Sequence, residues 1–192
     1  ALPEDTPLGV RITFEVESNP VLSSVIIEGA EVFPESETER IFNDQYGQTL
    51  NLKVFEQGVE QVNQWYQDNG YVLGQVVGAP QVGDDGKVTL EVAEGKIKDI
   101  RVRFVNAEGE TVDEEGNLIE GRTREYIITR EIELKPGDIF QRQTAEKDIR
   151  RVFDLGIFED VRLGLEPAPE NPDTAVVIVN IVEKSTGSIA FG

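Results

Sequence analysis

The hydrophobic pattern of this chain repeats one order of elements. Runs of alternating apolar and polar residues that end in a carboxylate occur at 14–17, 90–94 and 179–183. Each of the two later runs is preceded by another strand pattern, helical segments, a glycine turn and a hairpin. Because such alternation is typical of a half-buried strand, the sequence predicts two complete βααββ units, which follow the last strand, 10–17, of a truncated one.

The first complete unit has a well-marked pattern. We expect a strand over 21–28, a helix over 34–45, a second helix capped by Asn51, and strands over 71–77 and 87–94. The second helix carries apolar side chains at the spacing of one helix face: Phe55, Val59, Val62 and Tyr66, with Trp65 beside them. An aromatic stripe could serve as a ligand-stacking platform, but burial against a sheet is the favoured interpretation.

The second complete unit follows the same plan. Its first strand begins at Lys96, and its long helix is expected to start at Asp138, which forms a capping-box pattern with Gln141. Strands over 157–163 and 175–182 close the unit. The helix face that we expect to be buried consists of Ala145, Ile149, Val152 and Phe153.

The second unit differs from the first by an insertion at 107–121, which is polar, acidic and interrupted by glycines. This composition predicts a surface loop or a loose hairpin. Its carboxylates lack the alternating oxygen ligands and the final glutamate of a calcium-binding EF-hand loop. A solvated loop that contacts a neighbouring module or a partner is therefore the favoured interpretation.

The composition argues against several classes of ligand and of catalytic group. The 192 residues include 18 basic and 37 acidic side chains, and the net charge of −19 repels nucleic acids and anionic lipids. Cysteine and histidine are absent, which removes thiolate nucleophiles, imidazole bases and the commonest transition-metal ligands. The pairs Asp84-Asp85 and Glu159-Asp160 would lie in an exposed turn or on opposite faces of a strand, which suits no buried acid/base couple. We expect no enzyme and no catalytic, cofactor or metal site.

Three motifs of the chain resemble a known family. They are Val25-Ile26-x-x-Gly29, Tyr66-x-x-x-Gly70-Tyr71, and the run Arg-Val-Phe-Asp-Leu-Gly-Ile-Phe-Glu-Asp-Val at 151–161. Together with the repeated plan, they are similar to POTRA (polypeptide-transport-associated) domains of the BamA-like outer-membrane assembly factors. The acidic insertion resembles the cyanobacterial and plastid branch. Residues 185–192 resemble the start of a membrane-barrel strand, with a flexible tail as the alternative.

The resemblance implies an α+β fold of tandem POTRA modules. Each module would pack a three-stranded mixed sheet on two antiparallel helices. The expected divisions are the closing strand of a preceding module at 1–19, modules at 20–95 and 96–184, and the start of a barrel or a linker at 185–192.

The resemblance also implies a function. The chain would be a periplasmic arm, attached to the outer membrane through the protein's own C-terminal β-barrel, that receives unfolded outer-membrane proteins. Accessory assembly proteins would be further partners, and no nucleic acid or small-molecule substrate is expected. The alternative is the POTRA region of a translocation channel of the two-partner secretion or plastid import type. A division-protein arm with one POTRA module and a membrane helix is another class, which the tandem copies disfavour.

In this family the second strand of each module lies at a sheet edge. An edge strand presents unpaired backbone N–H and C=O groups, to which an extended client can add. Edges that are merely protected from aggregation are the equal alternative. We expect Gly74 and Gly78 to weaken or bulge the first edge, and the short junction Glu94-Gly95-Lys96 to restrict hinging. The residues expected to bind clients are Tyr71, Val72, Gly74, Val76, Ile157, Phe158, Val161 and Leu163.

Overall fold

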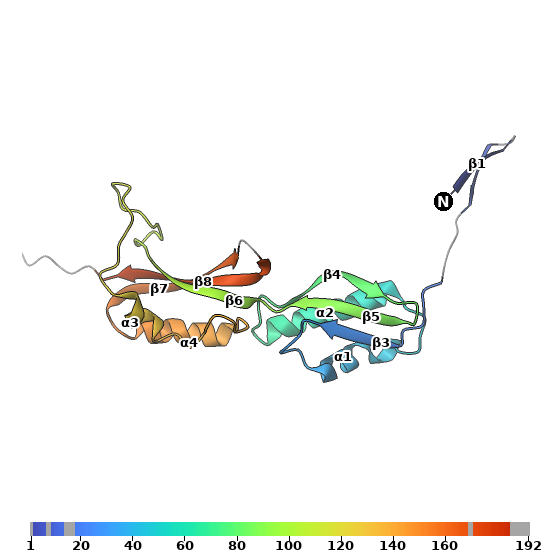
Figure 1. The fold of residues 1–192 in the computed structure, drawn as a ribbon, viewed down its shortest axis with the longest axis horizontal. Coiled ribbons are helices and arrows are strands. Elements are labelled where there is room, and N and C mark those ends of the chain that lie inside the picture. The colour runs from blue at the N-terminus through green and yellow to red at the C-terminus, as the bar shows by residue number, and fades with distance from the viewer. Residues whose placement is uncertain (1, 7–8, 14–17, 169–170, 185–192) are drawn as a thin grey trace, which may run out of the picture.

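The computed structural model describes residues 2–6, 9–13, 18–168 and 171–184 (Figure 1). Within these ranges no helix is long and apolar enough to cross a membrane. The predicted barrel-like segment at 185–192 lies outside the described residues. The elements in chain order are β1 (Leu2–Thr6), β2 (Gly9–Thr13), β3 (Ser24–Glu28), α1 (Glu35–Phe42), the 3-10 turn η1 (Asn43–Gln45), α2 (Leu52–Asp68), β4 (Gln75–Val82), β5 (Lys87–Ala93), β6 (Lys96–Phe104), α3 (Glu125–Thr129), α4 (Arg142–Phe153), β7 (Phe158–Ala168) and β8 (Asn171–Glu183).

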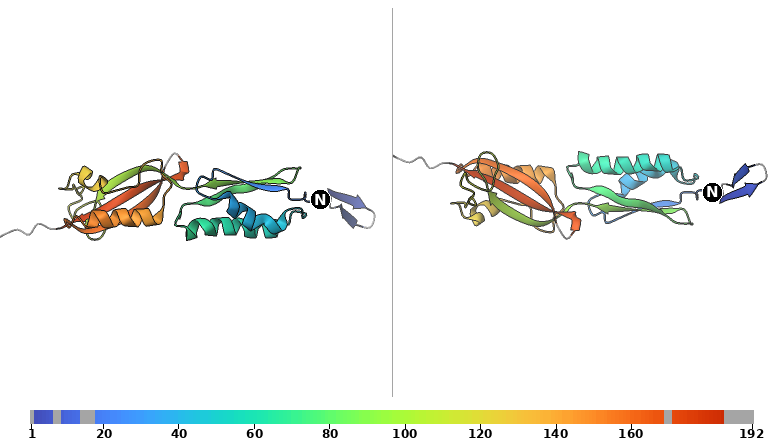
Figure 2. Two further views of the ribbon diagram at one scale, coloured as in Figure 1. Left: turned by 90° about the horizontal axis from the view of Figure 1, so that it is seen from below. Right: turned by 90° about the horizontal axis from the view of Figure 1, so that it is seen from above.

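Two three-stranded mixed sheets follow one another along the chain. Their strand orders are β3-β5-β4 and β6-β8-β7. The central strands are β5 and β8. The edge strands β3 and β6 run parallel to them, and the edge strands β4 and β7 run antiparallel to them. Helices cover one face of each sheet (Figure 2). The α+β architecture predicted from the sequence is therefore confirmed. We call residues 20–95 the N-terminal module and residues 96–184 the C-terminal module.

The N-terminal end forms a hairpin of its own. β1 and β2 pair antiparallel, with Leu2 opposite Thr13. The sequence pattern predicted one strand over 10–17, but the described part of that segment belongs to β2, and 14–17 lies outside the described residues. Among the described strand pairings, β2 pairs with β1 and joins neither module sheet. Its assignment as the closing strand of a preceding module stays a prediction.

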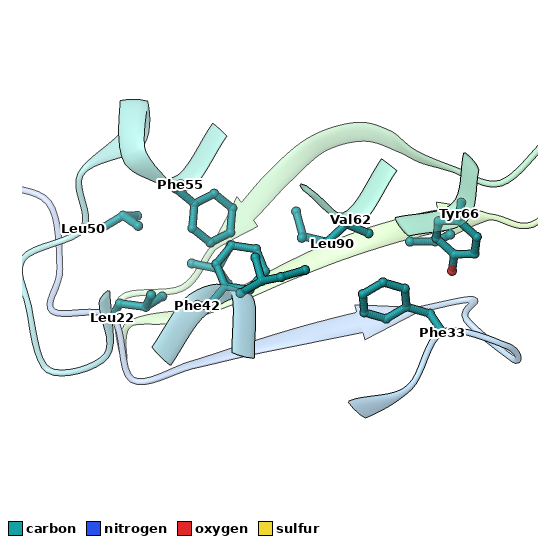
Figure 3. Close-up of a cluster of buried hydrophobic side chains, with 11 residues drawn as sticks. Leu22, Phe33, Phe42, Leu50, Phe55, Val62, Tyr66 and Leu90 are labelled. Atoms are coloured by element: carbon teal, nitrogen blue, oxygen red, sulfur yellow. The ribbon is translucent and has the colours of Figure 1, made fainter. Parts of the chain in front are cut away.

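The core of the N-terminal module forms around the predicted face of α2. Asn51 caps this helix, because its Oδ1 accepts hydrogen bonds from two backbone N–H groups of the first turn, at 3.1 and 3.3 Å. Phe55, Val62 and Tyr66 are buried, and the Phe42 ring from α1 stacks on Phe55 with centroids 4.9 Å apart (Figure 3). Each such buried side chain contributes about 1.5–3 kcal/mol of transfer free energy. The predicted stripe is thus core.

The C-terminal module departs from prediction at its long helix. α4 is capped by Gln141, whose Oε1 accepts from the Thr144 N–H at 2.8 Å. The prediction of Asp138 as the cap was wrong, because its carboxylate instead accepts from a backbone N–H in the preceding turn. Phe153, predicted to be buried, is 47% exposed, whereas Ala145 is buried as expected.

The acidic insertion is a loose hairpin, as predicted. A single bridge joins Val112 to Leu118, and Leu118 is 74% exposed. A carboxylate clasp ties the residues that follow it to the end of β8. Glu183 accepts hydrogen bonds from the backbone N–H groups of Arg122 and Thr123, at 3.0 and 2.8 Å, and from the Thr123 hydroxyl at 2.6 Å.

Candidate functional site

The second strand of each module, in chain order, lies at an edge of its sheet, as the family resemblance implied. These are β4 in the N-terminal module and β7 in the C-terminal module. An edge can accept an added strand only where its outward backbone groups are free. The two edges differ in this respect.

On β7, the outward groups are those of alternate residues. The Val161 N–H donates to the Asp160 side chain at 2.9 Å. Its partner on β8, Ile181, directs its carbonyl to the other side, where it accepts from Val105 of the segment after β6 at 2.9 Å. The pairing of β7 with β8 is regular from Asp160 to Pro167, so backbone groups alternate in direction along this stretch.

Leu163 and Leu165 therefore direct their N–H and C=O groups away from β8, toward the free edge. Pro167 continues the series. Proline has no N–H, so it is tolerated on the outward side of an edge strand. Among the described residues, none accepts a hydrogen bond from the Leu163 or Leu165 N–H. The edge of β7 therefore offers two free donors, at residues with apolar side chains.

On β4, the edge is largely closed. The Val76 N–H donates to Asn63 Oδ1 of α2 at 2.8 Å. The register then shifts between Val77 and Gln81, around Gly78 with φ of +70°, so the bulge predicted at Gly78 is confirmed. Gly74, predicted with it, lies before β4. Pro80 within this bulge has no N–H to offer. A client could not pair along β4 without displacing Asn63 and crossing the bulge.

A groove of about 490 Å³ runs between α4 and the free edge of β7. Its walls combine an apolar floor with charged side chains at the rim. An extended chain paired to β7 would direct alternate side chains toward this groove. The lining residues are Phe140, Arg142, Ala145, Glu146, Ile149, Arg150, Phe153, Val161 and Leu163.

A buried carboxylate ends the N-terminal module, directly before the junction. Glu94 is only 4% exposed. It accepts hydrogen bonds from the Tyr66 hydroxyl at 2.8 Å and from the backbone N–H groups of Glu31 and Val32 at 2.8 and 3.1 Å. Burial, and then the hydrogen bond to Glu94, raise the pKa of Tyr66. Lys96 pairs with Glu31 on the surface, and the hydrogen bond to that carboxylate raises the pKa of Lys96.

The turn after α2 packs into the C-terminal module. Val72 and Leu73 contact the hydrophobic cluster that includes Ile97, Leu134 and Phe140.

Two backbone hydrogen bonds also cross the junction. The Arg142 N–H donates to the Gly70 carbonyl at 2.9 Å, and the Phe140 N–H donates to the Gly95 carbonyl at 3.1 Å. The junction is a packed interface, which supports the expectation of restricted hinging.

Gly95 is required at the centre of this interface. Its φ is +69°, a conformation that side chains disfavour. A Cβ atom there would lie 2.2 Å from the Leu73 Cβ. The close approach of the turn to the junction thus depends on a residue without a side chain.

Several residues that were predicted to bind clients do not lie on an edge strand. β4 begins at Gln75, so Tyr71, Val72 and Gly74 lie in the turn before it and belong to no edge strand. Their apolar pattern comes from packing: Val72 faces the C-terminal module, and a Cβ at Gly74 would lie 2.4 Å from the Tyr66 ring.

The remaining members lie on or beside the edges. Val76 is on β4, and Phe158, Val161 and Leu163 are on β7, whereas Ile157 precedes β7 and is 45% exposed. The sequence pattern did not indicate four further residues of this region: Asn63, Leu165, Arg142 and Arg150. The spacing of positions 142, 146, 149 and 153 on one helix could have indicated the groove wall. No local signal could have linked Asn63 to Val76.

The comparisons with known proteins agree with this architecture. A family model described as "POTRA domain, ShlB-type" matches residues 21–95, and a POTRA model described as "Surface antigen variable number repeat" matches residues 105–184. The chain is therefore a tandem of POTRA domains.

Two solved structures show to which family of POTRA-containing proteins the chain belongs. POTRA1-3 of the periplasmic domain of Omp85 from Anabaena is 52% identical, with a TM-score of 0.91 over 96% of this chain and 74% of that one. The N-terminal domain of Omp85 from Thermosynechococcus elongatus is 47% identical, with a TM-score of 0.78 over 96% of this chain and 75% of that one. This chain belongs to the Omp85 family, in its cyanobacterial and plastid branch.

Curated relatives are longer proteins. Outer envelope protein 80 of the rice chloroplast, from Oryza sativa subsp. japonica, is 29% identical over 98% of this chain and 27% of its own length. An outer membrane protein assembly factor BamA, from Neorickettsia risticii, is 23% identical over 94% of this chain and 23% of its own length. The chain thus spans about a quarter of these relatives.

Proposed function

We propose that this chain is the periplasmic arm of an outer-membrane protein that inserts or translocates polypeptides, and that unfolded outer-membrane proteins dock on it by adding a strand to β7. In this proposal the arm is attached through a C-terminal β-barrel of the same protein and has no enzymatic activity of its own. Membership of the Omp85 family supports the role.

The observation that carries the docking site is the pair of outward backbone groups at Leu163 and Leu165 beside the groove under α4. Backbone pairing depends little on client sequence, which suits a receptor for many different clients. The groove adds contacts for alternate side chains. The closed edge of β4 leaves β7 as the better docking strand of the two.

The test replaces Leu165 by proline and titrates an isotope-labelled sample of the whole chain with a peptide from an outer-membrane barrel strand. The N–H of Leu165 is not used by β8, so its loss should cost the fold little, as Pro167 already shows on the same side of the strand. One backbone hydrogen bond contributes about 0.5–1.5 kcal/mol, so binding should weaken by about 2- to 12-fold.

Leu165→Ala is the matched control, because it removes the side chain and keeps the N–H. Amide shifts in wild type should concentrate on β7 and α4. Equal peptide affinity in Leu165→Pro and Leu165→Ala would refute strand addition at β7. Proline at Val76 or Val161 would be a poorer test, because both N–H groups already bond to side chains of the chain itself.

A further inference from the structure

The wall of the groove on α4 carries a line of exposed side chains. Arg142, Glu146, Arg150 and Phe153 line it at intervals of four, four and three residues. On a helix this spacing places side chains on one face, in a row along the axis. Because α4 leads through a short turn into β7 and packs against it, the row runs beside the free edge of β7.

The two arginines of this row stand out against the charge of the chain. The net charge is −19, and most arginines in the described structure have a carboxylate within ion-pair distance. In the part of the chain that the structure describes, neither Arg142 nor Arg150 forms an ion pair, even though Glu146 lies four residues from each. Both guanidinium groups are exposed at the rim. The groove therefore offers two cations, one on either side of the Glu146 carboxylate, above an apolar floor.

The spacing of these cations suits an extended chain. Eight helical residues separate Arg142 from Arg150, which is about 12 Å along the axis at 1.5 Å per residue. An extended strand rises about 3.3 Å per residue and covers that length in about four residues. Its side chains at i, i+2 and i+4 point to the same face. The first and last would lie near the two arginines, and the middle one over Ala145 and Ile149.

We propose that the groove of the C-terminal module selects extended segments with a carboxylate at i and i+4 and an apolar side chain at i+2. This inference rests on the proposed docking of clients at β7 and adds the chemistry of the client. A guanidinium group binds a carboxylate through paired N–H donors, which gives geometric as well as charge selectivity. The rest of the acidic surface repels the same segment, so its attraction is confined to the groove.

The experiment measures the affinity of three peptides for the whole chain by calorimetry. The peptides share one alternating β-strand sequence and differ only at i and i+4, which are both Glu, both Gln or both Lys. Two exposed ion pairs contribute about 0.4–2 kcal/mol together, so the Glu peptide should bind about 2- to 30-fold more tightly than the Gln peptide. The preference should shrink as salt is raised.

Two variants locate the effect. The double variant R142Q/R150Q should bind the Glu and Gln peptides equally. Lys147→Gln also removes a positive charge from α4, but at a position that does not line the groove, so it should keep most of the preference. A preference that Lys147→Gln reduces as much as R142Q/R150Q would overturn the groove assignment.

The remaining outcomes separate this inference from the proposed function. Equal binding of the Glu and Gln peptides to wild type, or tighter binding of the Lys peptide, would overturn the charge selectivity. Strand addition would still stand if Leu165→Pro weakened all three peptides. If Leu165→Pro weakened none of them, the docking mode itself would fail. A concentration-dependent dimer that R142Q/R150Q dissolves would make a second copy of the chain the occupant, and would also overturn the inference.

Discussion

Removal of the Tyr66 hydroxyl tests whether the carboxylate at the junction stabilises the fold. In Tyr66→Phe the ring keeps its contacts, including the edge-on packing with Trp65 at 5.3 Å between centroids. The change removes only the hydrogen bond to Glu94, 2.8 Å long and buried. Hydrogen bonds to charged groups contribute about 1.5–3 kcal/mol. Glu94 retains two backbone donors, so we expect a loss of about 2 kcal/mol in the free energy of unfolding.

The assay is urea unfolding followed by the fluorescence of Trp65, the single tryptophan of the chain. It lies next to Tyr66 and reports on the N-terminal module. For a chain of this size, a loss of about 2 kcal/mol also lowers the melting temperature by about 4–8 °C. The control is the variant Glu94→Gln, whose amide must place an N–H group against a backbone donor, and which should cost more than Tyr66→Phe.

The double variant completes the cycle. Tyr66→Phe removes the hydrogen bond to the carboxylate, and Glu94→Gln weakens the same bond by removing the negative charge. The combined loss should therefore be smaller than the sum of the two. A loss below about 0.5 kcal/mol in Tyr66→Phe, or strict additivity with Glu94→Gln, would refute the assignment of this bond as a main stabilising contact of the N-terminal module.

Three further predictions concern single side chains. Gly95→Ala should push the Leu73 turn away and change the angle between modules, which small-angle scattering would detect; an unchanged profile would contradict the packed junction. Asn63→Ala should lower the free energy of unfolding by about 1 kcal/mol, because the Val76 N–H loses its acceptor; urea unfolding measures this loss. Amide exchange at Val76 should also be faster, and unchanged exchange would contradict the hydrogen bond to Asn63. Burial raises the pKa of Glu183, but hydrogen bonds from the clasp outweigh this and lower it to about 2. The clasp should therefore stabilise the fold above pH about 4.5 and lose its effect as the pH falls toward 2; Glu183→Gln should flatten this dependence, and an equally steep acid loss would contradict it.

The elements that the sequence predicted well are those with local signals. Asn51 was identified as a cap because a cap bonds to residues two and three positions ahead. The stripe from Phe55 to Tyr66 was identified because helical spacing repeats within one element. Such features need no knowledge of distant neighbours.

The errors arise where distant residues decide the outcome. The segment from Tyr71 to Gly74 has the apolar character of a strand, but its side chains pack on Tyr66 and on the next module, so the strand starts only at Gln75. Asp138 and Gln141 both have side chains that can cap a helix. Asp138 instead accepts a hydrogen bond within the turn before α4, so Gln141 caps the helix. The closure of β4 depends on Asn63, thirteen residues before Val76 in sequence.

The seating of Val72 and Leu73 among apolar side chains beyond the junction has a consequence for dissection of the protein. A fragment that starts at Lys96 would lack both side chains and would expose the cluster around Ile97 and Phe140 to water. Such a fragment should be less stable and prone to self-association, although the boundary looks clean in the linear sequence. A start upstream of β3 would keep both the interface and the core that supports it whole.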